Sequence, residues 1–363
     1  MTKEDIMKKT AAIFLAIIVI LILLFIGSNA EQQRHLYVSP DGSDGQDGSL
    51  GNPLRTLQEA ASRAAAGTIV HVRGGVYEEG LVVQHSGTES EPVVFRAYEG
   101  EEVVLSGADF ESREGDTALV AIEDQNYVEI RGFTLQDLTT ELADETVMGI
   151  FVSGSSSHIV LGGNRVRRIG TQSAEGNAHG IAVYGTGAMT DITVIDNVIE
   201  DLTLGASEAL VLNGNIDGFE ITDNVVRRCD NIGIDLIGHE GVSPEMDYVR
   251  NGIVSGNEVY EISSFGNPAY GNDYSAGGIY VDGGKDIRIE NNEVHHNDIG
   301  IEASSEHAGE FAERIEIVGN AVYENIYTGI AIGVKSAPVT NAIQIINYNC
   351  MSINTQSVES MVS

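Results

Sequence analysis

The chain has 363 residues, of which 42% are hydrophobic, so it is long enough to bury a core in one large domain or two ordinary ones. Its formal net charge of −34 excludes nucleic-acid binding, which depends on basic side chains that neutralise phosphates, and it repels other anionic polymers unless cations bridge them. So many carboxylates favour adaptation to salt, because ions screen their mutual repulsion; an ordinary acidic secreted protein is the alternative.

The N-terminus has the pattern of a secretory signal. Lys8 and Lys9 precede an apolar stretch over 11–26, and the small residues at 28–30 stand at the spacing of a cleavage site. We therefore expect residues 1–30 to be a signal peptide. The apolar stretch is only a little short of a membrane span, so an uncleaved anchor is the alternative. In both cases the remaining chain lies outside the cytoplasm.

The next segment, LYVSPDGSDGQDGS (36–49), combines a strand with an acidic, glycine-rich loop. Pro53 and Gly67 then bracket a helix that we predict over 54–66. TIVHVRGGVYEE (68–79) follows as a pair of short strands. The three aspartates of the loop do not match the spacing of an EF-hand, so we interpret the loop as a solvated turn rather than a calcium site.

A repeat occupies most of the remaining chain. Seven copies recur at intervals of 27 to 35 residues, at 127–138, 158–169, 191–202, 218–229, 251–262, 286–297 and 314–325. Six copies carry an asparagine at the same position: Asn164, Asn197, Asn224, Asn257, Asn292 and Asn320. A second short strand follows each copy, at 149–154, 180–185, 209–214, 233–238, 278–283, 300–305 and 329–334. Short strands, glycine turns and the absence of helical spacing predict a parallel β-helix, in which stacked coils share one core.

These repeats, together with the segment from Leu36 to Gly80, resemble the right-handed parallel β-helix proteins of the pectate-lyase-like superfamily. The resemblance implies an all-β solenoid with a short N-terminal capping helix. We expect the β-helix over 36–346, with the cap over about 36–80, and an irregular, possibly truncated tail over 347–363. The superfamily includes lyases, glycosidases, epimerases and adhesins, so the resemblance implies a fold more than an activity.

Two cysteines, Cys229 and Cys350, stand about four coils apart in this repeat. Four coils correspond to roughly 19 Å at the usual strand spacing, which is too far for a disulfide. We therefore expect two free thiols with structural roles.

The candidate site lies on the outward face of the second strands, because alternate residues of a strand point to opposite faces. The inward positions are aliphatic throughout. One outward column reads Phe151, Ala182, Val211, Asp235, Tyr280, Glu302 and Ala331, and the other reads Ser153, Tyr184, Asn213, Ile237, Asp282, Ser304 and Gly333. With coils about 4.8 Å apart, the backbones at Asp235 and Glu302 are separated by roughly 10 Å, and those at Asp235 and Asp282 by roughly 8 Å.

This patch predicts a carboxylate-based glycosidase. Asp235 and Glu302 are the expected acid and base, with Asp282 assisting or exchanging roles, since carboxylates about 6.5–9.5 Å apart suit an inverting enzyme. The expected substrate-binding residues are Tyr280, Tyr184, Asn213, His179 and Glu208. Inserts over 170–180, 201–209, 238–251 and 263–278 are expected to wall a groove above the patch. Solvated surface carboxylates are the structural alternative.

A uronate lyase or epimerase is the second hypothesis. The superfamily's lyases use a Lys or Arg base, and the resemblance implies Ca²⁺ near Asp235 and Asp282 that neutralises a substrate carboxylate. The only lysines after the signal are Lys285 and Lys335, and neither is on an outward column. Arg227, Arg228, Arg250 and Arg314 are expected on other faces or turns, so no base matches. A non-catalytic carbohydrate-binding or cell-surface β-helix is the third hypothesis.

We predict a secreted protein that acts as a monomer on a polysaccharide or oligosaccharide, without a certain cofactor. Zinc is not expected, because His295 and His296 occupy neighbouring positions at a strand end and are not expected to converge on one metal ion.

Overall fold

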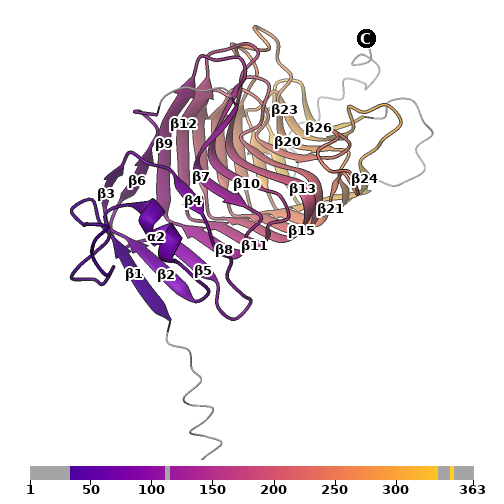
Figure 1. The fold of residues 1–363 in the computed structure, drawn as a ribbon. Coiled ribbons are helices and arrows are strands. Elements are labelled where there is room, and N and C mark those ends of the chain that lie inside the picture. The colour runs from indigo at the N-terminus through magenta and orange to yellow at the C-terminus, as the bar shows by residue number, and fades with distance from the viewer. Residues whose placement is uncertain (1–32, 111–114, 334–343, 347–363) are drawn as a thin grey trace, which may run out of the picture. The chain divides into compact units, whose positions relative to one another are not determined.

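The computed structural model describes residues 33–110, 115–333 and 344–346. The chain divides into two units, Met1–Arg34 and His35–Ser363, and the second unit contains the stacked coils. Successive coils run side by side through this unit, as Figure 1 shows. The predicted right-handed parallel β-helix is confirmed. The expected signal segment and the expected tail lie outside the described residues. Within the described part of the chain, no helix is long and apolar enough to cross a membrane.

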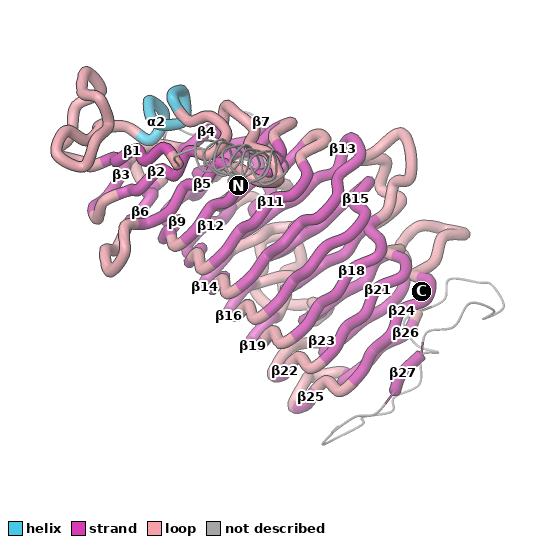
Figure 2. Tube along the Cα trace, turned by 90° about the horizontal axis from the view of Figure 1, so that it is seen from below, coloured by secondary structure: helices cyan, strands magenta, loops and turns pink. Residues whose placement is uncertain are grey.

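Three parallel sheets form the walls of the coils, and Figure 2 shows two of these walls with their strands in ladder order. Sheet 1 contains the strands before the asparagine position: β1 (Arg34–Val38), β2 (Thr68–Val72), β5 (Val93–Ala97), β8 (Asn126–Arg131), β11 (Ser157–Gly162), the second halves of β13 (Asn177–Ile195) and β15 (Leu210–Thr222), β18 (Val249–Ser255), β21 (Lys285–Glu290), β24 (Glu313–Val318) and β27 (Gln344–Ile346).

Sheet 2 contains the strands after the asparagine: β3 (Gly75–Tyr77), β6 (Val103–Ser106), β9 (Phe133–Thr140), β12 (Arg165–Thr171), β14 (Val198–Leu202), β16 (Val225–Cys229), β19 (Glu258–Ile262), β22 (Glu293–His295) and β25 (Ala321–Tyr323). Sheet 3 carries the predicted second strands: β4 (Leu81–Val83), β7 (Gly115–Glu123), β10 (Glu145–Ser153), the first halves of β13 and β15, β17 (Ile234–Ile237), β20 (Gly277–Asp282), β23 (Ile299–Ser304) and β26 (Thr328–Ile332). Because β13 and β15 continue from sheet 3 into sheet 1, these two sheets are joined.

Left-handed backbone conformations at fixed positions make the corners of each coil. The corner between sheets 1 and 2 has positive φ in all seven copies, at Gly132, Gly163, Asp196, Asp223, Gly256, Asn291 and Gly319. Glycine, asparagine and aspartate tolerate this region best, so the sequence places the turn. The residue five positions later, within or just after the sheet 2 strand, also has positive φ in every copy, from Asp137 to Glu324.

The six repeated asparagines form a hydrogen-bonded ladder at the first of these corners. From Asn164 to Asn320, each amide Nδ2 donates to Oδ1 of the asparagine in the next coil, at 2.9–3.1 Å. The same Oδ1 also accepts the preceding asparagine's backbone N–H, for example from Asn197 to Asn224 at 2.9 Å. Satisfied polar groups at a buried corner fix the stacking register of the coils.

The inward faces of the three sheets form one continuous core. Its sheet 3 columns include Ile150, Ile181, Leu210, Ile234, Ile279 and Ile301, as predicted. A separate, smaller apolar cluster lies on the outward face of sheet 3: Met148, Ala182, Val211 and Ile237, with Ala118, Phe151 and Tyr184 packed against it. The outward face of sheet 3 therefore also buries apolar side chains.

The capping helix α2 (Leu57–Arg63) is shorter than the predicted 54–66. It begins late because Thr56 is the N-cap, with its hydroxyl accepting the N–H of Glu59, and because the Asp44 carboxylate holds the N–H groups of Arg55 and Thr56 in a non-helical turn. It ends at Ala64, whose backbone is extended. The aspartates of the acidic loop thus hold a turn.

The thiol of Cys229 is free and buried, as predicted, whereas Cys350 lies outside the described residues. Strand β27 pairs with β24, so a further coil begins after residue 343.

Candidate functional site: a row of carboxylic acids on sheet 3

The predicted register of the outward column is confirmed. Asp235 of β17 pairs with Tyr280 of β20, and Tyr280 pairs with Glu302 of β23. Asp282 is two residues after Tyr280 on the same face, opposite Ser304. Asp235 and Glu302 are 67 positions apart in the chain. The structure nevertheless places Asp235, Asp282 and Glu302 on three neighbouring strands.

Asp235 is not a solvated surface group, since only 2% of its area is exposed. Its Oδ1 accepts the N–H of Leu236 at 2.8 Å. Burial raises the pKa of Asp235 well above its usual range, and the charges of Glu208 and Asp282 raise it further. A buried carboxyl without a cationic partner keeps its proton, as a general acid must.

The other two acids of the row also hold their protons more tightly than usual. Burial raises the pKa of Asp282 to about 6, against the opposing effect of a 2.8 Å hydrogen bond from the Glu306 N–H. Burial likewise raises the pKa of Glu302 to about 7, although the Ser304 hydroxyl donates to it at 3.3 Å. Tyr280, which separates Asp235 from Glu302, has its hydroxyl 2.9 Å from that of Ser304.

Two coils earlier, His179, Tyr184 and Glu208 form a linked group. Nδ1 of His179 lies 3.1 Å from the carbonyl oxygen of Glu208 and donates to it, so Nε2 accepts the Tyr184 hydroxyl at 3.3 Å. Burial lowers the pKa of His179 to about 4, which keeps the ring neutral. Burial raises the pKa of Glu208 to about 8, with a further contribution from Glu240. His179 therefore orients Tyr184 from beneath the surface and does not rim a groove.

Sequence reasoning did not include Glu240 in the site. Asn213, which is buried, donates from Nδ2 to Oε2 of Glu240 at 2.7 Å, and its Oδ1 has no hydrogen-bond partner among the described residues. The signal available in the sequence was the position of Glu240, five residues after Asp235 on the loop that leaves the same strand.

The donor atoms of this region bear on whether it could hold a metal ion. Among the described residues, Glu240, Asp282 and His307 each place one ligand atom within 4.8 Å of the others. Two carboxylates, an imidazole nitrogen and the amide oxygen of Asn213 do not make the six to eight oxygen ligands that calcium takes. The calcium site implied by the superfamily does not fit, and no catalytic step is assigned to it.

The rings of His295 and His296 are hydrogen-bonded to each other, with their Nδ1 atoms 2.7 Å apart, and His296 has a positive φ of 56°. Among the described residues, neither histidine belongs to a group of converging metal-ligand atoms. His295 also stacks between Tyr260 and Tyr323, with ring centroids 4.9 and 4.8 Å away.

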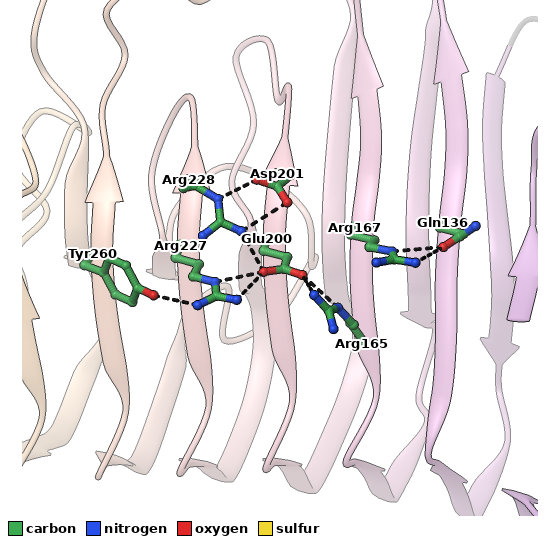
Figure 3. A network of polar contacts seen from close by, with 8 residues as sticks. All are labelled: Gln136, Arg165, Arg167, Glu200, Asp201, Arg227, Arg228 and Tyr260. Carbon is green, nitrogen blue, oxygen red and sulfur yellow. Dashed lines mark hydrogen bonds and ion pairs between the residues drawn. The ribbon is translucent and has the colours of Figure 1, made fainter. Parts of the chain in front are cut away.

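A second group of charges lies on the outward face of sheet 2 (Figure 3). Glu200 of β14 is 1% exposed and accepts hydrogen bonds from Arg165, Arg227 and Arg228 on the two neighbouring strands. Burial opposes ionisation of Glu200, but the arginines outweigh it and lower the pKa to about 2. Arg227 also donates to the Tyr260 hydroxyl at 2.7 Å.

The coils and the acid row define a parallel β-helix protein with a candidate active site on the outer face of one sheet. The model of the family described as "Pel9A-like, right handed beta helix region" matches residues 36–222, and the chain belongs to this family.

Two curated proteins are similar in sequence. The uncharacterized protein YwoF of Bacillus subtilis is 55% identical over 299 residues, which cover 82% of this chain and 64% of that protein. The pectate lyase PEL9 of Emericella nidulans is 34% identical over 176 residues, which cover 39% of this chain and 42% of that protein. The chain thus spans less than two thirds of either relative.

Two solved structures share the fold. The pectate lyase Pel9A superposes with a TM-score of 0.60 at 13% identity, over 90% of this chain and 79% of that chain. The GH136 lacto-N-biosidase from Eubacterium ramulus superposes with a TM-score of 0.62 at 14% identity, over 91% of this chain and 63% of that chain. At such low identity, a lyase and a glycosidase on the same fold do not decide the activity.

Proposed function

We propose that this chain is an extracellular β-helix enzyme that hydrolyses glycosidic bonds of a polysaccharide or oligosaccharide. Asp235 is the general acid, Glu302 is the general base, and Asp282 assists between them. Tyr280, Tyr184, Asn213 and Glu208 bind the sugar, and His179 positions Tyr184. The similarity to a pectate lyase and a lacto-N-biosidase supports a carbohydrate substrate.

The buried row of carboxylic acids carries this proposal. Hydrolysis of a glycosidic bond needs one carboxyl that is protonated near neutral pH and a second that accepts a proton from water. Asp235 has the strongest reason to stay protonated, because it is buried among other acids. Glu302 titrates with a pKa of about 7, so its ionised form is available at neutral and mildly alkaline pH. In such a mechanism Asp235 protonates the leaving oxygen while Glu302 activates a water molecule.

Elimination is less well supported, because it requires a base of the Lys or Arg type above the groove. Lys285 lies at the start of β21 in sheet 1, where its Nζ is 3.2 Å from Glu313 and 4.4 Å from the ring centre of Tyr248. Lys335 lies outside the described residues.

The test is to incubate the protein with a panel of polysaccharides at high salt, with and without chelator. Hydrolysis produces new reducing ends without the ultraviolet absorbance of an unsaturated uronate. Asp235→Asn and Glu302→Gln should each lower the rate about 10²–10⁴-fold. Asp286→Asn is the matched control, because it removes a carboxylate that pairs with Arg314 away from sheet 3.

Full turnover in both site variants would reject the assignment of acid and base. Unsaturated products would instead establish a lyase. Retention on a polysaccharide matrix without any cleavage would establish a binding protein.

A further inference from the structure

Among the described residues, the side of the coils that carries the acid row lacks lysine and arginine. The strands of sheet 3 and the loops on either side of them, at 169–190, 201–216, 229–249, 262–284 and 297–313, contain neither, and their histidines are His179, His239 and His307. The described lysines and arginines of the coils after residue 126 lie on sheets 1 and 2: Arg131, Arg165, Arg167, Arg168, Arg227, Arg228, Arg250, Lys285, Arg288 and Arg314. A sugar bound on sheet 3 therefore meets carboxyl groups, hydroxyls and aromatic rings.

This arrangement disfavours an anionic sugar. Burial already opposes ionisation of the acids of the row, and a uronate would add one more negative charge to each sugar unit beside Asp235, Asp282 and Glu240. Recognition of a carboxylate in a protein site normally uses arginine, which presents several N–H donors at once. An uncharged pyranose has no such requirement.

An exposed aromatic patch lies beside the acid row, on the loop that leads into β20 and on a later coil. Half of the ten large hydrophobic side chains that the described residues expose are in this patch: Phe265, Tyr270, Tyr274, Ile326 and Tyr327. The rings of Phe265 and Tyr274 are stacked, with centroids 4.8 Å apart and planes at 18°, and Tyr327 meets Tyr274 edge-on at 6.3 Å. An exposed apolar patch of this kind marks an interaction site.

The loop that presents these rings is held in place by buried hydrogen bonds. Asn267 donates to the carbonyl oxygens of Gly205 and Asp230 at 2.8 and 2.7 Å, which ties the loop to two preceding coils. The Ser264 hydroxyl donates to the carbonyl of Asp273 at 2.8 Å, across the base of the loop. The rings are thus presented without a large cost in ordering.

The loop that carries Phe265 and Tyr274 also lies near acidic residues of the preceding coils. Tyr270 of this loop interacts with the side chain of Asn231, which donates to the carbonyl oxygen of Ser207, next to Glu208. Burial raises the pKa of Tyr270, and the charges of Glu208 and Glu306 raise it further. The loop therefore lies on the side of the coils that carries the acid row.

We infer that Phe265, Tyr270, Tyr274 and Tyr327 form a subsite for uncharged pyranose units of the glycan whose bond the acid row cleaves. The inference rests on the proposed function for the place of the reaction, and it adds the substrate class: neutral glycans rather than polyuronates. The apolar faces of neutral pyranose rings pack against aromatic rings, and their hydroxyls need no cation.

The test measures binding of cellohexaose, xylohexaose, N-acetylchitohexaose and hexagalacturonate to the full chain by calorimetry, with EDTA or with added Ca²⁺. We expect at least one neutral hexasaccharide to bind at least tenfold more tightly than hexagalacturonate in both conditions. Tyr274→Ala should weaken that binding about tenfold, and Phe265→Leu, which keeps an apolar side chain but loses the ring, should weaken it in the same direction. Tyr323→Ala, which removes a stacked tyrosine from sheet 2, is the control and should leave the dissociation constant unchanged.

Tighter binding of hexagalacturonate in either condition, binding of none of the neutral hexasaccharides, or unchanged binding in both Tyr274→Ala and Phe265→Leu overturns the inference. Thermal unfolding of each variant shows whether a loss reflects the subsite or the fold. Binding of a neutral glycan without any new reducing ends would contradict the proposed hydrolysis and leave the subsite standing, so the two failures are distinguishable.

Discussion

The outward faces of sheets 2 and 3 both bury carboxyl groups, but the neighbours of these carboxyl groups differ in charge. On sheet 2, the buried carboxylate Glu200 receives three arginines, and its pKa falls to about 2 (Figure 3). On sheet 3, the buried carboxyls of Asp235 and Asp282 and the half-buried carboxyl of Glu302 lie among other acids, and their pKa values rise, although His307 opposes the rise at Asp282. The strand spacing is the same on both faces, so the difference comes from side chains alone.

The comparison separates stabilising residues from residues that cost stability. An ion network that satisfies each member strengthens the stacking of the coils, whereas buried acids without cations weaken it. Buried acids that destabilise a fold indicate a functional role, because functional sites are where proteins tolerate such groups. Sheet 2 therefore acts as structural support, and sheet 3 has the characteristics of a working surface.

The largest effect on stability is expected from Glu200→Gln. The substitution leaves Arg165, Arg227 and Arg228 beside each other without their shared carboxylate. Because the arginines are partly exposed and water screens them, the expected loss is about 2–3 kcal/mol in the free energy of unfolding, below the range for fully buried pairs. Denaturant unfolding at neutral pH measures it. A loss no larger than that of Asp286→Asn would show that the network does not support the coils.

Asp235→Asn should have the opposite sign. The amide keeps the acceptor for the Leu236 N–H and removes a buried acid whose ionisation the surroundings resist. We expect the variant to be about 1 kcal/mol more stable at pH 8 while losing activity, the exchange that active-site acids commonly show. The measurement pairs denaturant unfolding with the hydrolysis assay. Destabilisation by Asp235→Asn would mean that this acid is part of the structural support.

The two faces should also differ in the sign of their pH dependence. The raised pKa of Glu302, about 7 against an ordinary 4.5, contributes stability that is complete below pH 4.5 and is lost as the pH rises to 7. The lowered pKa of Glu200, about 2, contributes stability that is present above pH 4.5 and is lost as the pH falls toward 2. Unfolding free energies measured from pH 3 to pH 8 should therefore show the two losses on opposite sides of pH 4.5.

Substitution of each carboxyl group shows which residue causes each loss of stability. Glu302→Gln should reduce the loss above pH 4.5 by about 1–2 kcal/mol, since Glu302 is half-buried and partly screened, and Glu200→Gln should reduce the loss below it. If Glu302→Gln leaves the profile above pH 4.5 unchanged, Glu302 ionises freely in the folded protein, and its part in the acid row is wrong.

The β-helix could be predicted because the same sequence pattern recurs in every coil. Seven copies with aligned glycine, aspartate and asparagine corners fix the stacking register, and that register brought Asp235, Tyr280 and Glu302 into one row. The burial of Asp235 could not be predicted from its own strand, because the residues that shield its side chain from solvent belong to neighbouring coils and their loops. The same reason explains why Glu240 was missed: its contact with Asn213 joins a loop to a different coil.

The structure of single elements was predicted less well than their pairing. The helix was expected to begin at residue 54, but the carboxylate of Asp44, far back in the acidic loop, delays it to Leu57. The pairing of Arg165 and Arg227 through Glu200 depends on three coils being in register, and it was not predicted from the sequence.

The smallest effect is expected from Tyr323→Ala, which shortens the stack of rings on sheet 2. Tyr323 stacks on His295 at 4.8 Å and donates its hydroxyl to Glu293 at 2.5 Å on an exposed surface. Stacked aromatic pairs contribute about 0.5–1.5 kcal/mol, and the exposure of this pair favours the lower end. Thermal and denaturant unfolding should show a loss of about 0.5 kcal/mol, with glycan binding and hydrolysis unchanged. A loss of activity without a loss of stability would place a binding function on sheet 2 as well, and the contrast between a supporting face and a working face would then fail.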